Sequence, residues 1–161
     1  MSDELTRLPP RLAAALSGEG FRRRRRLVVL LATSDADGFP RVALLTLGEV
    51  RAASDSRLAV AVRSRSRTAV NLVRRTTATL LYLSRSLTAS VQARAGRGRV
   101  CRTDPERRLF PLRVERVRVE QPDPSEADVE LLTGPTFTGG GAPALFSDEL
   151  FLELAEAAAT G

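Results

Sequence analysis

The stretch R-L-A-V-A-V-R-S-R-S-R-T-A-V-N-L-V-R-R, from Arg57 to Arg75, is the one around which the rest of the sequence is organised. It opens with an unbroken apolar run, 58–62, which is typical of a buried strand. From Ser66 onward the apolar residues recur at helical spacing, and Ser66 is a good N-cap because its hydroxyl can accept a first-turn N–H. The stretch therefore predicts a strand that leads directly into a short helix, 66–74.

The start of this helix has the chemistry of an anion site. A helix N-terminus carries unpaired N–H donors and a partial positive charge. Ser66, Arg67 and Thr68 lie in the first turn, and Arg63 and Arg65 come just before it. Guanidinium groups bind phosphate in a bidentate way, and hydroxyls add hydrogen bonds. A capped surface helix with solvated arginines explains this stretch equally well, so the stretch alone leaves both interpretations open.

Length and charge indicate one globular domain, 1–161, with a basic surface. The chain has 161 residues, of which 43% are hydrophobic, and a formal net charge of +6. All 25 basic residues are arginine. A positive surplus favours anionic partners, such as phosphate-bearing small molecules, nucleic acid or an acidic surface.

Missing residue types exclude several kinds of site. The chain has no histidine and no tryptophan, which removes histidine general bases, imidazole metal sites and a histidine-ligated haem. Cys101 is the one cysteine, so neither an intrachain disulfide nor a multi-cysteine metal site can form. We expect no metal site and interpret Cys101 as a packed strand residue.

The run Arg22 to Arg26, followed by the apolar residues 27–33, has the order of an export signal. It begins well inside the chain, however, and leads straight into a turn and another strand, so we do not interpret it as one. No apolar stretch approaches the ~20 residues that a membrane helix needs. We therefore expect a soluble, cytoplasmic protein without membrane contact.

The remaining chain predicts short strands flanked by helices. Strands are expected at 27–34, 40–47, 49–53, 58–62, 77–84, 87–102 and 112–120, with a bend at Gly96 and Gly98. An amphipathic helix is expected within 1–20, broken near Pro9 and Pro10, with Leu8, Leu12 and Leu16 on one face. Ser147 is expected to cap a final helix. Six or seven short strands with one internal helix predict a small β-barrel.

Four motifs in this order resemble those of the pyridoxamine 5'-phosphate oxidase-like, FMN-binding split-barrel family. They are L-A-T-S-D-A-D-G-F-P (31–40), R-V-A-L-L-T (41–46), S-R-T (66–68) and V-Q-A-R (91–94). The resemblance covers roughly 27–120. It implies a mainly β, α+β fold: a six- to seven-stranded split β-barrel with a short internal helix and N- and C-terminal helices.

The resemblance also implies an FMN cofactor, whose phosphate Arg41, Ser66 and Arg67 would hold. Five further cofactor positions follow from the resemblance. Thr46 and Thr68 stand where the oxidases usually have lysine. Ala61 and Val62 would line the flavin through backbone atoms, and Gln92 would reach the pyrimidine edge of the ring. Members of the family are homodimers with the flavin at the subunit interface, which implies two symmetric sites.

The departures from the family pattern argue against a true pyridoxamine phosphate oxidase. Two phosphate-binding lysines are threonine, and the C-terminal tryptophan and arginine that bind the vitamin in those enzymes have no counterpart. The C-terminal part, 134–161, with its glycine-rich stretch 134–141, resembles nothing in their tail. No catalytic residue and no small-molecule substrate can be named from the sequence.

Four functions remain open, in decreasing order of preference. The first is an FMN-dependent oxidoreductase or flavin reductase-like protein, and the second uses a deazaflavin on the same barrel. The third is a non-catalytic flavin-binding or stress-response protein. The fourth is nucleic-acid binding through Arg22 to Arg26 and the arginines around Ser66, which is disfavoured because aromatic residues make up only 4% of the chain and offer few stacking platforms.

Overall fold

The computed structural model describes residues 4–18, 26–120, 132–137 and 147–160. Of the arginine run 22–26 it describes only Arg26, and of the glycine-rich stretch 134–141 only residues 134–137, so the other residues of both lie outside it. Within the described ranges, no helix combines the length and apolar character that crossing a membrane requires.

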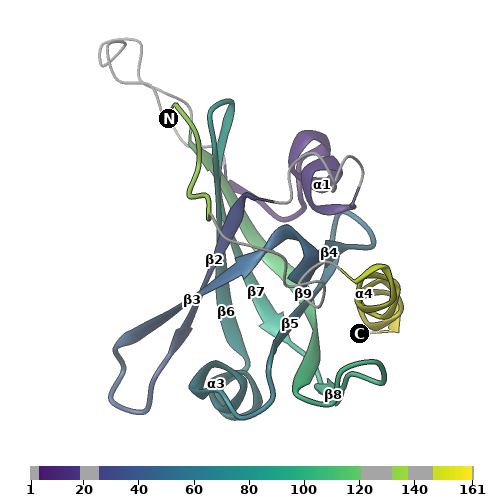
Figure 1. The fold of residues 1–161 in the computed structure, drawn as a ribbon. Coiled ribbons are helices and arrows are strands. Elements are labelled where there is room, and N and C mark those ends of the chain that lie inside the picture. Colours follow the sequence, from purple (N-terminus) through teal and green to yellow (C-terminus); the bar gives the residue numbers. More distant parts are fainter. Residues whose placement is uncertain (1–3, 19–25, 121–131, 138–146, 161) are drawn as a thin grey trace.

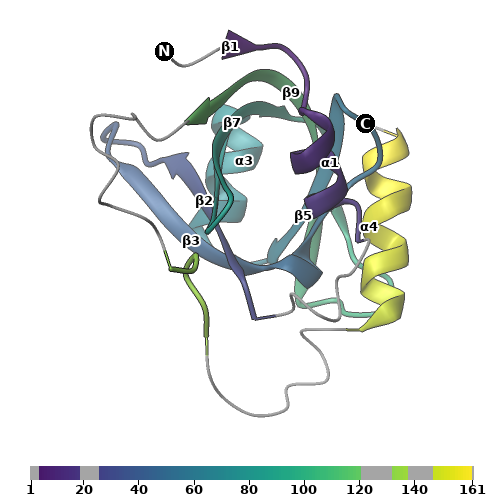
Figure 2. The same ribbon diagram turned by 90° about the horizontal axis from the view of Figure 1, so that it is seen from above.

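The described strands form one antiparallel sheet that curls into a half-barrel (Figures 1 and 2). They are β1 (Glu4–Leu5), β2 (Val28–Ser34), β3 (Pro40–Thr46), β4 (Val50–Ala52), β5 (Arg57–Arg63), β6 (Thr77–Ser84), β7 (Leu87–Ala95), β8 (Arg99–Val100) and β9 (Arg107–Glu120). Seven of them follow one another in the order β3-β2-β6-β7-β9-β5-β4, and β1 and β8 both pair with β9. The predicted split barrel of six to seven strands is confirmed.

The barrel is open between its two edge strands, β3 and β4, and because β4 pairs only with residues 58–60 of β5, the last residues of β5 are also unpaired on this side among the described strands. β3 pairs with β2, whereas β5 pairs with β4 and β9, so no ladder joins β3 to β5 among the described strands. The 3-10 helix η1 (Leu47–Glu49) connects β3 to β4. The predicted internal helix, α3 (Arg67–Arg75), follows β5 and lies across one mouth of the barrel, where Figure 2 shows it inside the ring of strands.

The barrel interior is filled by alternate residues of the strands. In β7, Ala89, Val91, Ala93 and Ala95 are buried, and the residues between them are more exposed. Leu72 of α3 is completely buried in the same core. Burying a leucine side chain contributes about 1.5–3 kcal/mol, which fixes α3 against the barrel.

The N-terminal helix is shorter than predicted. Leu8, Leu12 and Leu16 are all buried, as expected, but α1 spans only Pro10–Leu16. The prediction of a helix before the prolines is wrong, because Glu4–Leu5 forms β1 and pairs with β9. Proline is favoured in the first helical turn, where its missing N–H is not needed, so Pro10 starts the helix rather than interrupting it.

The C-terminal helix α4 (Asp148–Thr160) covers the outer face of β5. The amide of Leu150 donates to Ser147 Oγ at 3.1 Å, which confirms the predicted cap. Leu150 and Leu154 are buried with Ala59 and Ala61 of β5 in a second apolar cluster. β5 is therefore buried on both faces, which explains its unbroken apolar run.

The predicted long strand 87–102 divides into two. β7 ends at Ala95, and the glycines predicted to make a bend separate it from β8. Cys101 is buried, but it follows β8, so its assignment to a strand is wrong. Its thiol instead donates to Glu153 Oε1 of α4 at 3.3 Å.

Glu153 joins α4 to the segment around Cys101. Its carboxylate accepts hydrogen bonds from Arg99 at 2.8 Å and from the amides of Arg102 and Thr103 at 3.0 and 2.9 Å. Burial by itself would raise the pKa of Glu153, but these donors outweigh it and hold the pKa well below the usual range of a glutamate.

We expect Glu153 to make the fold sensitive to acid. A carboxylate with a lowered folded-state pKa stabilises the protein above its unfolded pKa of about 4.3, and this contribution is lost as the pH falls toward the folded pKa. The unfolding free energies of wild type and Glu153→Gln should therefore differ most at neutral pH and converge in acid. Urea titrations across this pH range measure the difference, with Glu156→Gln as an exposed control. A pH-independent difference would contradict the assignment.

Candidate functional site

A cleft of about 190 Å³ opens where the barrel is split, between β3 and β5. Its lining residues come from β3, η1, β5 and the start of α3: Ala43, Leu44, Leu45, Glu49, Ala61, Val62, Arg63, Ser66 and Thr68. Four of the predicted cofactor positions, Ala61, Val62, Ser66 and Thr68, are thus brought together in one cleft.

The start of α3 presents several hydrogen-bond donors at this cleft. Ser66 is the N-cap, and its Oγ accepts from the amide of Ala69 at 3.1 Å, as predicted. No described residue accepts a hydrogen bond from the amides of Arg67 and Thr68. In the part of the chain that the structure describes, the hydroxyl of Ser66 donates to no acceptor. These groups and the positive end of the helix favour an oxyanion.

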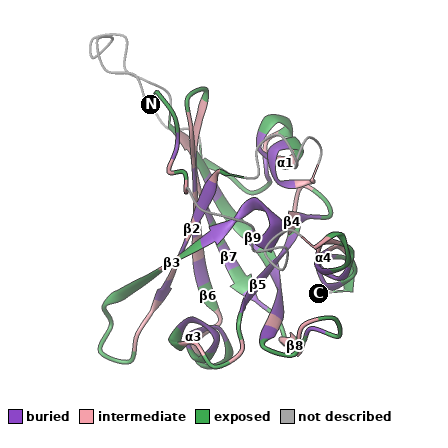
Figure 3. Cartoon of the chain, in the orientation of Figure 1, coloured by how far each residue is buried: buried purple, intermediate pink, exposed green. Residues whose placement is uncertain are grey.

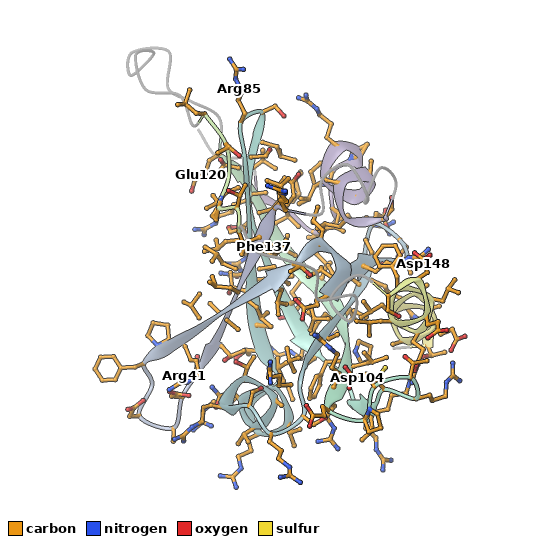
Figure 4. The ribbon with its side chains drawn as sticks, viewed as in Figure 1. Arg41, Arg85, Asp104, Glu120, Phe137 and Asp148 are labelled. Carbon is orange, nitrogen blue, oxygen red and sulfur yellow. The ribbon has the colours of Figure 1, made fainter. Side chains whose placement is uncertain are left out.

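Arg41 lies beside this helix, next to Asp35 (Figure 4). Its Nε donates to both carboxylate oxygens of Asp35, at 3.2 and 3.0 Å. Asn71 of α3 donates to the same carboxylate at 2.8 Å. The hydrogen bond from Asn71, together with the charges of Arg41 and Arg67, outweighs partial burial and lowers the pKa of Asp35.

Asp35 thus pairs directly with Arg41, one of the three predicted phosphate ligands, and the charge of Arg67, a second one, acts on it from a greater distance. Both hydrogen bonds from Arg41 use Nε, and neither of its Nη atoms has a partner among the described residues. These Nη atoms remain available for an anion. Neither Arg41 nor Arg67 lines the cleft itself, although Arg67 lies between the lining residues Ser66 and Thr68 in the chain, and Arg41 is two residues before Ala43.

Thr46 has a different environment from the other predicted positions. Its amide and hydroxyl both donate to Glu49 Oε2, at 2.8 and 3.1 Å, and it does not line the cleft. The other oxygen of Glu49 pairs with Arg107 Nη1, and both side chains are only 9% exposed. The charge of Glu49, the one carboxylate among the described residues that line the cleft, is therefore balanced by Arg107.

Gln92 lies outside this cleft, on the outer face of β7. The ladders place Gln92 opposite Thr79, Thr79 opposite Ala32, and Ala32 opposite Val42. Because residues paired directly across strands share a sheet face, Gln92 faces the same side as Val42. Val42 is 56% exposed and its neighbour Leu44 69% exposed, along the end of β3 that Figure 3 shows as exposed.

The donor set of the cleft fits a phosphate group. Its lining includes the hydroxyl of Ser66, the amide of Thr68 and the guanidinium group of Arg63, and Arg67 lies between Ser66 and Thr68 in the chain. Such charge-assisted hydrogen bonds are the strong ones in proteins. The cleft is too small for a ring system beside the phosphate, so any such ring extends beyond it.

Sequence reasoning missed three residues around the cleft: Asp35, Glu49 and Asn71. Asn71 is a polar residue within the apolar repeat of the helix, and this was a usable signal. Asp35 was assigned only to a turn, which it does form, since Gly38 donates to its carbonyl at 3.0 Å. Nothing in the local sequence indicated the pairing of Glu49 with Arg107.

No protein-family model and no curated protein matches the chain. Among solved structures, a protein assigned as a pyridoxamine 5'-phosphate oxidase from Lactobacillus delbrueckii is similar with a TM-score of 0.57 at 20% identity, over 72% of this chain and 97% of that one. An FMN-binding protein from Syntrophomonas wolfei gives a TM-score of 0.51 at 9% identity, over 66% and 86% of the two chains. An F420 reductase gives 0.50 at 14% identity, over 63% and 96%. The chain therefore has the split-barrel fold of pyridoxamine 5'-phosphate oxidase-like proteins.

Proposed function

We propose that the chain binds FMN, with the phosphate in the cleft at the start of α3, and serves as a flavin-dependent oxidoreductase. The observation that carries the proposal is the set of uncommitted donors at Ser66, Arg67 and Thr68, placed where the barrel is open. Bound FMN would supply the redox chemistry, and the protein would bind and orient it. The FMN-binding neighbour supports the choice of cofactor at the level of fold.

In this proposal the chain's own residues have distinct tasks. Ser66 and the amides of Arg67 and Thr68 donate to the phosphate, while Arg41 and Arg67 balance its charge. Ala61 and Val62 approach the flavin with backbone atoms, because their side chains are buried. Thr46 acts through Glu49, which it helps to hold beside the cleft.

We further propose a homodimer with the flavin between subunits. Phe39, Val42 and Leu44 are exposed by 71%, 56% and 69%, and such apolar side chains at one sheet edge are typical of an interface. Gln92 shares a sheet face with Val42 but lies three strands from β3. A second copy covering this face would bring Gln92 of one protomer toward the flavin of its partner.

We expect the wild-type protein to be a dimer and Leu44→Arg to be a monomer, because a buried unpaired charge opposes association. Light scattering at micromolar concentration measures the mass of each. Val100→Arg is the control, since Val100 is an apolar residue on β8 that is also exposed, by 50%. A monomeric wild type, or a dimeric Leu44→Arg variant, would contradict the proposed interface.

Arg41→Ala should weaken FMN binding by roughly ten- to a hundredfold. Charge-assisted hydrogen bonds contribute about 1.5–3 kcal/mol each, at ~1.4 kcal/mol per tenfold. Removing Arg41 also leaves the carboxylate of Asp35 without its ion-pair partner. Flavin fluorescence quenching measures the affinity, with circular dichroism as the folding control and Arg74→Ala as the charge-matched control. Unchanged binding by a folded Arg41→Ala variant would exclude Arg41 from the site.

A deazaflavin is the second candidate cofactor. The observation that favours it is a further cleft of about 440 Å³ beside the start of α3, lined by Arg63, Ser64, Arg65, Pro105 and Glu106. The two arginines there have no ion-pair partner among the described residues, so they would suit a cofactor with an acidic tail.

The absorption spectrum of the purified protein, with mass spectrometry of the small molecule released on denaturation, tests the proposed function. FMN, with bleaching of its visible bands by a nicotinamide donor, supports the oxidoreductase. FMN that no donor bleaches supports a non-catalytic flavin-binding protein, and a deazaflavin supports the second cofactor. Failure of the apo-protein to bind either cofactor would overturn the proposal.

A further inference from the structure

A second cavity, of about 420 Å³, lies at the other end of α3. It is lined by residues from the last turns of α3, from the bend after β7 and from the start of β9: Leu72, Val73, Thr76, Ala95, Gly96, Arg97, Gly98 and Arg108. None of these residues lines the phosphate cleft. The two sites are thus separate, although one short helix contributes to both.

Arg108 points into the barrel mouth at this cavity. It pairs with Val62 across the β5–β9 ladder, and Val62 belongs to the main core, so both side chains share the inner face. Arg108 Nε is buried and, among the side chains that the structure describes, is the one buried nitrogen or oxygen without a hydrogen-bond partner. A buried donor of a charged group without an acceptor is costly, which indicates an acceptor supplied from outside the chain.

The other lining residues indicate what this acceptor is attached to. Arg97 adds a second guanidinium group, and neither arginine forms an ion pair with a described carboxylate. Leu72, Val73 and Ala95 provide an apolar wall. The combination of two cationic groups with an apolar wall fits a small molecule that has one anionic head and an apolar body.

The nearby helix end limits the charge of this head group. α3 ends at Arg75 and is capped by Thr76, which adopts the left-handed conformation with φ 61°. A helix C-terminus carries a partial negative charge. The carbonyl of Thr76 is already bonded by the amide of Ala95 at 2.6 Å. The partial negative charge at the C-terminus of α3 repels a dianion more strongly than a monoanion, so a carboxylate fits this cavity better than a phosphate.

We propose that this cavity binds a small carboxylate with an apolar body, whose head group pairs with Arg108 and Arg97. The proposal does not depend on flavin binding, because it shares no residue with the phosphate cleft. A carboxylate accepts two parallel hydrogen bonds from one guanidinium group, so it would satisfy the buried Nε of Arg108.

Titration of the ¹⁵N-labelled full-length protein with sodium benzoate tests the proposal. We expect saturable shifts at the amides of Gly96 and Gly98 at millimolar benzoate and at constant ionic strength. Benzamide, the neutral analogue, and inorganic phosphate should both bind at least tenfold more weakly. Absence of saturable shifts with both benzoate and hexanoate would overturn the proposal, and equal binding of benzamide or phosphate would overturn the choice of a carboxylate.

Arg108→Met tests the residue itself, since methionine keeps much of the volume and removes the unpartnered donor. We expect at least a tenfold loss of benzoate affinity with no loss of stability without ligand, whereas Arg113→Met, on the exposed face of β9, should bind normally. Normal benzoate binding by Arg108→Met would overturn the assignment, as would a large loss of stability, which would mean a structural role. Arg97→Gln provides a second variant, and unchanged affinity in it would also contradict the proposal.

Discussion

Arg107→Met is expected to lower the free energy of unfolding by about 3–5 kcal/mol, because it removes one partner of a buried ion pair and leaves the other charge uncompensated. Arg107 and Glu49 are only 9% exposed, and Arg107 also donates to Asp104 at 3.0 Å. The two residues join η1, at the open side of the barrel, to the start of β9. Urea unfolding followed by circular dichroism measures the loss.

Two further variants separate charge burial from simple loss of packing. Arg113→Met, on the same strand, removes an exposed arginine from a surface pair with Glu115 and should cost less than about 1 kcal/mol. The double variant Glu49→Gln with Arg107→Met should recover much of the lost stability, since the buried charge of Glu49 is then also removed and Asp104, which loses its partner, is partly exposed. Equal losses in Arg107→Met and Arg113→Met would contradict the account.

Ser66→Asp is expected to weaken FMN binding by roughly a hundredfold or more while leaving the fold intact. Aspartate is as good an N-cap as serine, so α3 keeps its start. Its carboxylate, however, replaces a donor by a negative charge where the phosphate is proposed to bind. One charge-assisted hydrogen bond, which contributes about 1.5–3 kcal/mol, is lost, and the repulsion between the carboxylate and the phosphate adds to this.

Ser66→Asn is the matched control, because asparagine also caps helices but carries no charge. It should bind FMN more weakly than wild type and far more tightly than Ser66→Asp. Flavin titration gives the affinities, and thermal unfolding shows whether each cap is retained. Tight FMN binding by a folded Ser66→Asp variant would move the phosphate away from α3.

Features fixed by local patterns could be predicted from the sequence. The change from an apolar run to helical spacing at Ser66 predicted the junction of β5 and α3, and the hydroxyl caps at Ser66 and Ser147 are present. The cleft unites Ala61, Val62, Ser66 and Thr68 because these positions are close in sequence. The roles of all the proposed cofactor residues stay predictions until binding is measured.

Features that depend on distant partners could not be predicted. β9 begins at Arg107, whereas the predicted strand began at residue 112. The arginines at the start of β9 indicate solvent exposure when they are considered alone, so the sequence pattern did not reveal this part of the strand. Arg107 is buried only because Glu49, from the other side of the split, is there to pair with it. The place of Cys101 beside Glu153 likewise depends on the assembled barrel. The pairing of Arg41 with Asp35, in contrast, is local, because the two residues flank the turn between β2 and β3.

The central claim is that the start of α3 recognises a flavin through its phosphate. Parallel titrations of the apo-protein with FMN and with riboflavin, which lacks only the phosphate, test it most directly. We expect FMN to bind wild type roughly a hundredfold or more tightly than riboflavin, since several charge-assisted hydrogen bonds are at stake. Ser66→Asp should abolish this preference. Equal affinities of wild type for the two flavins would contradict the claim.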